Sequence, residues 1–265
     1  MKFKADHDYH IHSFISPCSS DAAQNPQTIL EYGVNNGFSS LCLTDHAWDK
    51  NVECGCPNPW LSRGVDLDKI RENLPLPVSD KCRMYFGCET DMNRFGQIGI
   101  TKAEAEKMDF IVLSVSHLHL SSFTVDPLVA DDPKQYKDWY FSRLMRLFEL
   151  DLPLYKTGIS HFTTNLVYKK SPSECIGSFT DEELHAVFEN AAKNRMGVEL
   201  NVKCFLNLGE NREIMLRPYK IAKEEKCRFY LASDAHHPGE LLRAKQVFEE
   251  ITDILSLTED DKFHI

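Results

Sequence analysis

The chain has 265 residues, of which 42% are hydrophobic and 26% are charged, and its formal net charge is −10. These values are typical of a globular protein, and we expect a single domain over residues 1–265. The acidic balance argues against binding to long nucleic acids or anionic membranes. No apolar run approaches the roughly 20 residues that span a bilayer. Because the first residues lack an apolar signal core, we expect a cytoplasmic protein.

Short apolar, β-branched or aromatic runs alternate with amphipathic patterns along the chain. In chain order, they predict strands at 3–9, 39–44, 83–89, 110–116, 155–160, 197–201 and 228–232, and helices at 26–36, 102–107, 133–150, 180–194, 210–226 and 238–254. Pro26 and Pro133 are typical of a first helical turn, and the run from Thr180 to Glu183 is a capping box.

Strands that alternate with helices indicate parallel βα units. Seven such strands closing on themselves would form a short relative of the (β/α)8 barrel, and an open doubly wound sheet is the alternative. Two long interruptions, at 48–80 and 118–132, are expected to form lids or walls of a site.

The nine cysteines are odd in number and irregularly spaced, which does not indicate a disulfide framework. The close pair Cys54-Gly-Cys56 is expected to be a loop.

Histidine or acidic side chains lie at or directly after the ends of six of the seven predicted strands. They are His10, His12, Asp45, His46, Glu89, His117, His119, His161, Asp234 and His236. In a closed parallel barrel the carboxyl ends of all strands surround one opening, so we expect these side chains to meet there. A lone histidine at a strand end is more often structural, but many clustered without a metal would be hard to satisfy. Imidazole with carboxylate suits Zn²⁺, Fe²⁺ or Mn²⁺, and about eight ligands indicate two or three metals that share a carboxylate.

In this order the motifs resemble those of the polymerase and histidinol phosphatase (PHP) family. Its pattern is an HxH pair, a DH pair, a lone glutamate, two separate histidines and a final DxH, matched here by His10-Ile-His12, Asp45-His46, Glu89, His117, His161 and Asp234-Ala-His236. The resemblance spans nearly the whole chain. It implies a distorted (β/α)7 barrel, related to the TIM barrel, with a trinuclear metal site at the C-terminal face of the strands.

The resemblance also implies how the ligands are divided. One metal would be held by His10, His12, Glu89 and Asp234; a second by Glu89, as a bridge, with His117 and His161; and a third by His46 and His236. The family usually supplies one more histidine to the third metal, and Cys18 stands at that position here. Because a thiolate binds zinc well, we predict Cys18 as a ligand. The alternatives are a weaker third metal, or Asp21 or water in its place.

Within the family, the chain resembles the stand-alone, histidinol-phosphatase-like group. This implies hydrolysis of a phosphate monoester by a metal-bridging hydroxide, with L-histidinol phosphate as the best single substrate and Glu89, Asp234 and His236 as catalytic residues. That group tends to have an arginine shortly after its "ELN" segment, where this chain has Leu206. The predicted substrate-binding residues are Arg143, Lys203, Arg212 and His119, with Lys169 and Lys170 as further candidate cations.

Three alternatives remain open at this stage. The first is a PHP phosphoesterase acting on nucleotides or other small phosphoesters, and the second is a non-catalytic, regulatory PHP protein. The third is an amidohydrolase with similar ligands, which usually adds a metal-bridging lysine. Around the predicted site, Asp45 and Asp8 are expected to orient metal ligands, and His7 is expected to face the other side of its strand.

Overall fold

The computed structural model describes residues 1–55, 65–206 and 208–265. Over these residues a single seven-stranded sheet forms, in which the strands follow one another in chain order and all neighbours are parallel. The strands are β1 (His7–Ile11), β2 (Ser40–Leu43), β3 (Arg83–Asp91), β4 (Phe110–Ser114), β5 (Thr157–Ile159), β6 (Gly197–Asn201) and β7 (Arg228–Ala232). All seven predicted strands are therefore present, although β1 begins later and ends later than expected.

The last strand returns to the first. The backbone N–H of His12 donates to the carbonyl of Ala235 over 3.0 Å, and that of Asp234 donates to the carbonyl of His10 over 2.7 Å. These bonds continue the contact between β7 and β1 beyond the end of β7. The sheet is thus a nearly closed, distorted (β/α)7 barrel, which confirms the predicted barrel and excludes the open doubly wound sheet.

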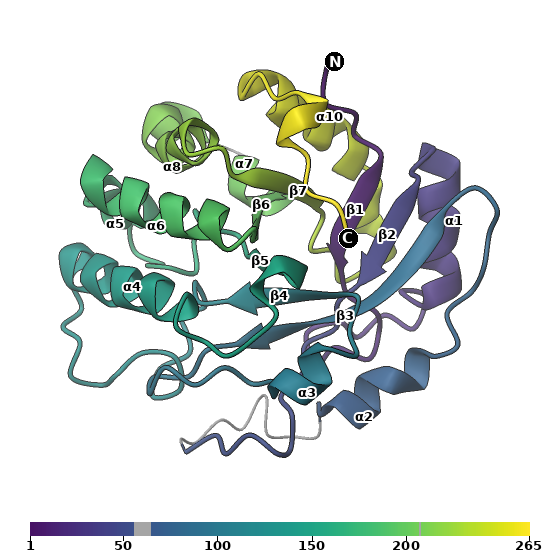
Figure 1. Ribbon diagram of the computed structural model, residues 1–265, viewed down its shortest axis with the longest axis horizontal. Helices are drawn as coiled ribbons and strands as arrows, with labels where there is room; N and C mark the ends of the chain where they lie inside the picture. Colours follow the sequence, from purple (N-terminus) through teal and green to yellow (C-terminus); the bar gives the residue numbers. More distant parts are fainter. Residues whose placement is uncertain (56–64, 207) are drawn as a thin grey trace.

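Helices surround the strands on the outside (Figure 1). They are α1 (Pro26–Asn36), α2 (Leu67–Ile70), α3 (Lys102–Ala105), α4 (Pro133–Leu147), α5 (Pro172–Gly177), α6 (Asp181–Lys193), α7 (Val202–Phe205), α8 (Arg212–Glu224), α9 (Pro238–Leu241) and α10 (Ala244–Ile254). Short 3-10 turns occur at Arg71–Asn73, Leu154–Lys156, Gly209–Asn211 and Glu259–Asp261. No helix of the described residues is long and apolar enough to cross a membrane.

The predicted helix starts hold in detail. Pro26 and Pro133 begin α1 and α4, and Thr180 forms the predicted capping box with Glu183. The predicted helix at 238–254 is instead broken into α9 and α10. Three short helices, α2, α5 and α7, were not predicted, because four to six residues are too few for a periodic pattern to be recognised.

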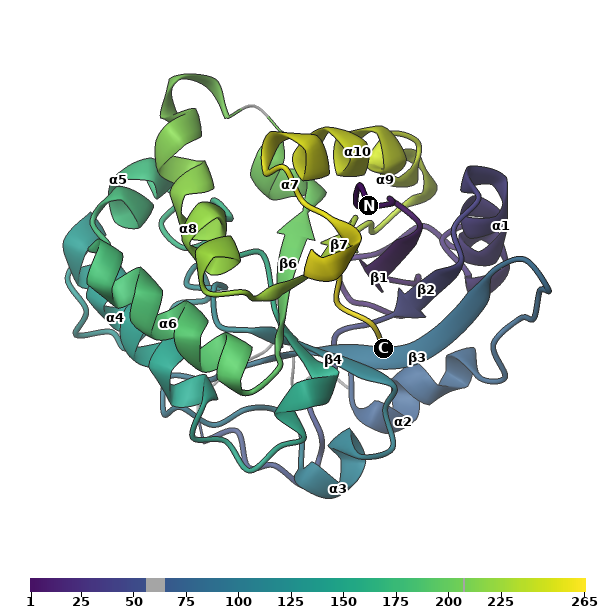
Figure 2. The ribbon, with the colours of Figure 1, turned by 45° about the horizontal axis from the view of Figure 1, so that its top comes forward.

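The amino-terminal end of the barrel is filled by apolar side chains. Tyr9, Cys42, Phe110, Val112, Tyr230 and Phe263 pack together, and the last of these comes from the C-terminal segment, which lies across the ring of strands (Figures 1 and 2). Glycines make room for this cluster: a Cβ at Gly158 would lie 2.4 Å from the ring of Tyr230. The histidine and acidic side chains of the predicted site lie at the opposite, carboxyl end of the strands, as expected for a barrel of this kind.

Seven of the described cysteines are free thiols: Cys18, Cys42, Cys82, Cys88, Cys175, Cys204 and Cys227. Cys56, and with it the predicted Cys54-Gly-Cys56 loop, lies partly outside the described residues.

The two long interruptions differ in role. His119 and Leu120, from 118–132, line the pocket described below, whereas no described residue of 48–80 does. Asn73 from that segment instead donates to the Asp45 carboxylate over 2.8 Å.

Candidate metal centre and substrate pocket

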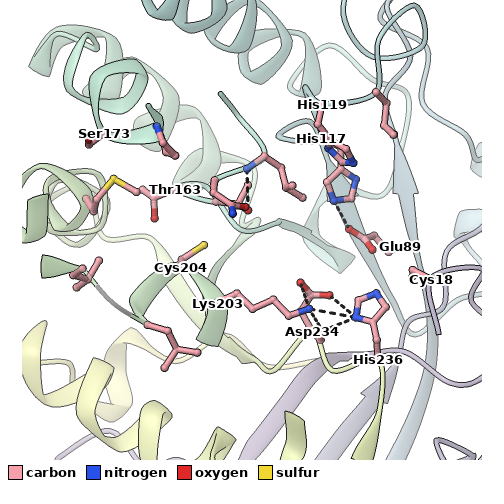
Figure 3. Close-up of a pocket in the computed structure, with 18 of the residues that line it drawn as sticks. Cys18, Glu89, His117, His119, Thr163, Ser173, Lys203, Cys204, Asp234 and His236 are labelled. Atoms are coloured by element: carbon pink, nitrogen blue, oxygen red, sulfur yellow. Dashed lines mark hydrogen bonds and ion pairs between the residues drawn. The ribbon is translucent and has the colours of Figure 1, made fainter. Parts of the chain in front are cut away.

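A pocket of about 840 Å³ opens at the carboxyl ends of the strands. Six predicted ligands line it: Cys18, His46, Glu89, His117, Asp234 and His236. His10, His12 and His161 lie beneath them and are buried. Figure 3 shows Glu89, His117 and His236 along one wall, with Lys203 extended toward Asp234. The structure therefore brings all nine predicted metal ligands to one place.

The first group of candidate ligands is centred on the two histidines of the HxH motif. Nε2 of His10 and Nε2 of His12 are 3.0 Å apart, and each is 3.3 Å from Oε2 of Glu89. Oδ1 of Asp234 lies 3.3 Å from Nε2 of His12. Ligand atoms about 2.1 Å from one zinc ion are separated by roughly 3.0–3.4 Å. The donor types and their spacing therefore fit one divalent metal.

Glu89 connects this group to the next. Its Oε2 faces His10, His12 and also Nδ1 of His46, which is 3.0 Å away. Its Oε1 lies 3.2 Å from Nε2 of His161 and 3.8 Å from Nε2 of His117. The two oxygens of one carboxylate thus face two different sets of imidazoles, which is the arrangement that a bridging ligand requires.

A third group of ligand atoms comes from His12, Cys18, His46 and His236, all within 4.8 Å of one another. Cys18 stands where the resemblance placed it, on the solvent side of the group. Burial raises the pKa of its thiol, and the nearby carboxylates of Glu89 and Asp234 add to that effect. A bound cation acts in the opposite direction and deprotonates a coordinating thiol.

Asp234 is held in an unusual backbone conformation. Its φ is +51°, in the left-handed region that few residues other than glycine adopt. Such strain is tolerated where the surrounding structure fixes the residue, and it is found preferentially at functional sites. Here the Asp234 N–H is bonded to His10, and its carboxylate faces His12 and Lys203.

The histidines are oriented from behind by groups that the sequence did not reveal. Nδ1 of His10 lies 3.2 Å from both carboxylate oxygens of Glu199, and Nδ1 of His117 lies 2.8 Å from Oδ1 of Asp91. Two other histidines contact hydroxyl groups. Nδ1 of His12 lies 2.9 Å from the hydroxyl of Ser16, and Nδ1 of His161 lies 2.6 Å from that of Ser116. A partner on Nδ1 fixes the ring and presents Nε2 as a ligand.

One sequence signal could have identified Glu199. It is an acid in the apolar run "GVELN", the one predicted strand without a charged or histidine residue at its end. Asp45 was predicted to orient a ligand, and its position agrees: it accepts from Ser16, whose hydroxyl contacts His12. Asp8 does not contact an imidazole. It accepts instead from Tyr32 and from the backbone N–H groups of Ser233 and His10.

The charges of the site call for a positive partner. Burial opposes ionisation of Glu89, but the facing His46 and His10 hold its pKa well below the usual value. Burial likewise lowers the pKa of His10, yet Glu199, Glu89 and Asp234 raise it well above the usual value. The carboxylates therefore favour a protonated, positively charged ring at His10. A bound divalent metal ion would displace that proton and supply the positive charge instead.

The predicted substrate-binding residues have different positions. Lys203 lines the pocket: its Nζ donates to the carbonyl of Asp234 over 2.6 Å and lies 3.3 Å from Nδ1 of His236. His119 also lines the pocket, and burial together with the nearby His117 lowers its pKa to about 3, so its ring is neutral. Arg212 is exposed at the start of α8 and is not among the lining residues.

The prediction for Arg143 is wrong. This residue of α4 is 3% exposed and lies outside the pocket. Its guanidinium donates to the backbone carbonyls of Met92, Asn93 and Val115. The amphipathic pattern placed Arg143 on a helix but could not show that its charged end reaches the loops after β3 and β4 instead of solvent.

Comparisons with known proteins agree with this geometry. The PHP domain model matches residues 8–203, and no curated protein matches the chain by sequence. One similar solved structure is the histidinol phosphate phosphatase from Lactococcus lactis subsp. lactis Il1403, complexed with zinc, L-histidinol and phosphate. It has 14% identity and a TM-score of 0.62, over 98% of this chain and 99% of that one.

A second is a candidate histidinol phosphatase from Listeria monocytogenes. It also has 14% identity and a TM-score of 0.62, over 91% of this chain and 99% of that one. At such low identity these two structures establish a shared fold. The family itself rests on the domain match, together with seven parallel strands and the HxH, DH and DxH motifs gathered at their carboxyl ends: the chain belongs to the PHP domain family.

Proposed function

We propose that the protein is a metal-dependent hydrolase of small phosphate monoesters. The observation that carries this proposal is the position of Glu89, whose two oxygens face different imidazole groups at 3.0–3.8 Å. Such a carboxylate is suited to hold two divalent metals close together. When bound, the metals supply Lewis acidity that activates water and neutralises charge on the phosphoryl group.

The proposed ligand sets follow the three groups of donor atoms. We assign His10, His12, Glu89 and Asp234 to one metal, Glu89, His117 and His161 to a second, and His46, His236 and Cys18 to a third. Zinc, manganese and iron all suit mixed imidazole and carboxylate ligands. Glu89, Asp234 and His236 are the proposed catalytic residues, and each of them belongs to one of these groups and lines the pocket.

Lys203 is the proposed phosphate-binding cation. It lines the pocket beside Asp234 and His236, and it follows the "ELN" segment by two residues. The histidinol-phosphatase-like group tends to have an arginine at the position of Leu206. We propose that Lys203 takes over the role of that arginine. An ammonium group at this position can bind a phosphate oxygen.

The choice of substrate has two candidates. The complex of the Lactococcus protein with L-histidinol and phosphate makes L-histidinol phosphate the first ester to assay. The pocket, at about 840 Å³, has room for the alternative of a larger ester such as a nucleoside monophosphate. Both belong to the same reaction class and require the same metal centre.

The test is a Glu89→Gln variant assayed with p-nitrophenyl phosphate in the presence of added Mn²⁺ or Zn²⁺. Glutamine keeps the shape of the side chain but removes the charge that would join the metals, so we expect activity to fall about 100-fold or more. Glu249→Gln on the exposed face of α10 serves as a matched control and should leave activity unchanged. Full activity of Glu89→Gln would contradict the proposal.

A further inference from the structure

The pocket extends well beyond the candidate metal ligands, and the walls of this outer part carry almost no charge. Its apolar lining consists of Leu120, Leu166, Pro172, Leu206, Leu208 and Met215. Its neutral polar lining consists of Thr163, Thr164, Asn165, Ser173 and Asn211. Figure 3 shows Thr163, Ser173 and Cys204 on the wall opposite Glu89. This outer part is where the alcohol portion of a phosphate ester would lie if its phosphate met the metal ligands.

The only acids among the described lining residues are Glu89 and Asp234. Both oxygens of Glu89 face imidazoles, and the Asp234 carboxylate faces His12 and Lys203. Neither carboxylate is therefore available to an ester's alcohol portion. Glu240, a further acid beside Lys203, accepts the backbone N–H of His236 and also lies 3.9 Å from Nζ of Lys203.

This lack of negative charge does not depend on the residues that the structure leaves undescribed. Residues 56–64 read CPNPWLSRG and residue 207 is asparagine, so none of them is an acid. Lys203 instead adds a positive charge to the pocket. An ammonium group that entered this region would lose water without gaining a carboxylate partner, which is unfavourable.

We propose that the pocket selects phosphate monoesters whose alcohol portion is uncharged and partly apolar, and discriminates against those that carry an ammonium group. This inference rests on the proposed function and specifies its substrate class. Aryl, arylalkyl and nucleoside esters meet the condition. L-Histidinol phosphate carries an amino group and does not meet it, although the similar solved structure makes this ester the first to assay.

The test uses two esters that differ only in the ammonium group, 3-phenylpropyl phosphate and L-phenylalaninol phosphate, with p-nitrophenyl phosphate as the reference. Release of inorganic phosphate by the metal-loaded wild-type protein is measured for each. We expect kcat/KM to be about tenfold or more higher for the uncharged ester, because the ammonium group of the other ester would lose water without gaining a carboxylate partner.

Equal or faster hydrolysis of phenylalaninol phosphate, alongside hydrolysis of p-nitrophenyl phosphate, would overturn the selectivity and leave the proposed function intact. Hydrolysis of none of the three esters by protein shown to contain metal would overturn the proposed function, and the selectivity with it. The two failures are therefore distinguishable within one experiment.

A variant that adds the missing charge sharpens the test. Asn211→Asp places a carboxylate in the lining with almost no change of shape, so it should raise kcat/KM for phenylalaninol phosphate several-fold relative to the uncharged ester. Asn35→Asp, on the exposed face of α1, adds the same charge away from the pocket and should leave the ratio unchanged. An unchanged ratio in Asn211→Asp, or the same rise in both variants, would count against the proposal.

Discussion

Glu199 in β6 and His10 in β1 meet inside the barrel, with both carboxylate oxygens 3.2 Å from Nδ1 of the histidine, although they are 189 positions apart in the chain. Both side chains are fully buried. Glu199 also accepts from Tyr230 over 2.8 Å and from Asn201 over 2.6 Å, which holds it in place. The carboxylate thus fixes the ring of His10 so that Nε2 faces His12 and Glu89.

Replacing Glu199 should therefore weaken metal binding without removing a ligand. In Glu199→Gln the charge that supports His10 is lost, and we expect metal affinity to fall about 10- to 100-fold. Competition with a coloured chelator measures this affinity, and circular dichroism verifies the fold. The exposed Glu224→Gln variant is the control. Unchanged affinity in Glu199→Gln would show that the contact does not support the metal ligand.

The thiol of Cys18 can be tested as a ligand by spectroscopy. With Co²⁺ bound, a thiolate ligand produces a sulfur-to-metal charge-transfer absorption in the near ultraviolet, and we expect this band in the wild-type protein. It should disappear in Cys18→Ser. Cys204→Ser is the matched control, because Cys204 lines the same pocket but belongs to none of the three ligand groups. Persistence of the band in Cys18→Ser would exclude Cys18 from the metal centre.

Lys203 and Arg212 offer a choice between two candidate phosphate-binding cations. Lys203 lines the pocket and Arg212 does not, so Lys203→Met should lower kcat/KM for p-nitrophenyl phosphate by about 10- to 100-fold, the effect of losing a hydrogen bond to a charged group. Arg212→Met should change it less than about twofold. Steady-state kinetics with both variants decides between them, and the reverse pattern would assign phosphate binding to Arg212.

Arg143 should affect stability much more than substrate binding. In Arg143→Met three buried carbonyls lose their donor, and we expect the free energy of unfolding to fall by on the order of 3 kcal/mol. Unfolding in urea measures this change. At a temperature where the variant is folded, its KM for p-nitrophenyl phosphate should match that of the wild type. A large rise in KM with unchanged stability would restore Arg143 to the substrate site.

Much of the barrel and of its metal centre can be predicted from the sequence. The seven strands, the starts of α1 and α4, and the ligands from His10 to His236 are local features: a short apolar run followed by a histidine or an acid. In a parallel barrel, chain direction alone brings such residues to one end. Successive βα units favour a strand order that follows the chain, but the backbone bonds of His12 and Asp234 that close the sheet were needed to exclude the open doubly wound alternative.

Only the tertiary structure shows which groups support the ligands and which cations reach the pocket. Glu199 meets His10 because the barrel closes, and Asp91 meets His117 because β3 and β4 pair in a particular register. Arg143 and Lys203 are equally basic in the sequence, yet one reaches backbone carbonyls and the other the pocket. These contacts depend on side-chain direction between elements distant in the chain, and the period of a single strand or helix does not contain that information.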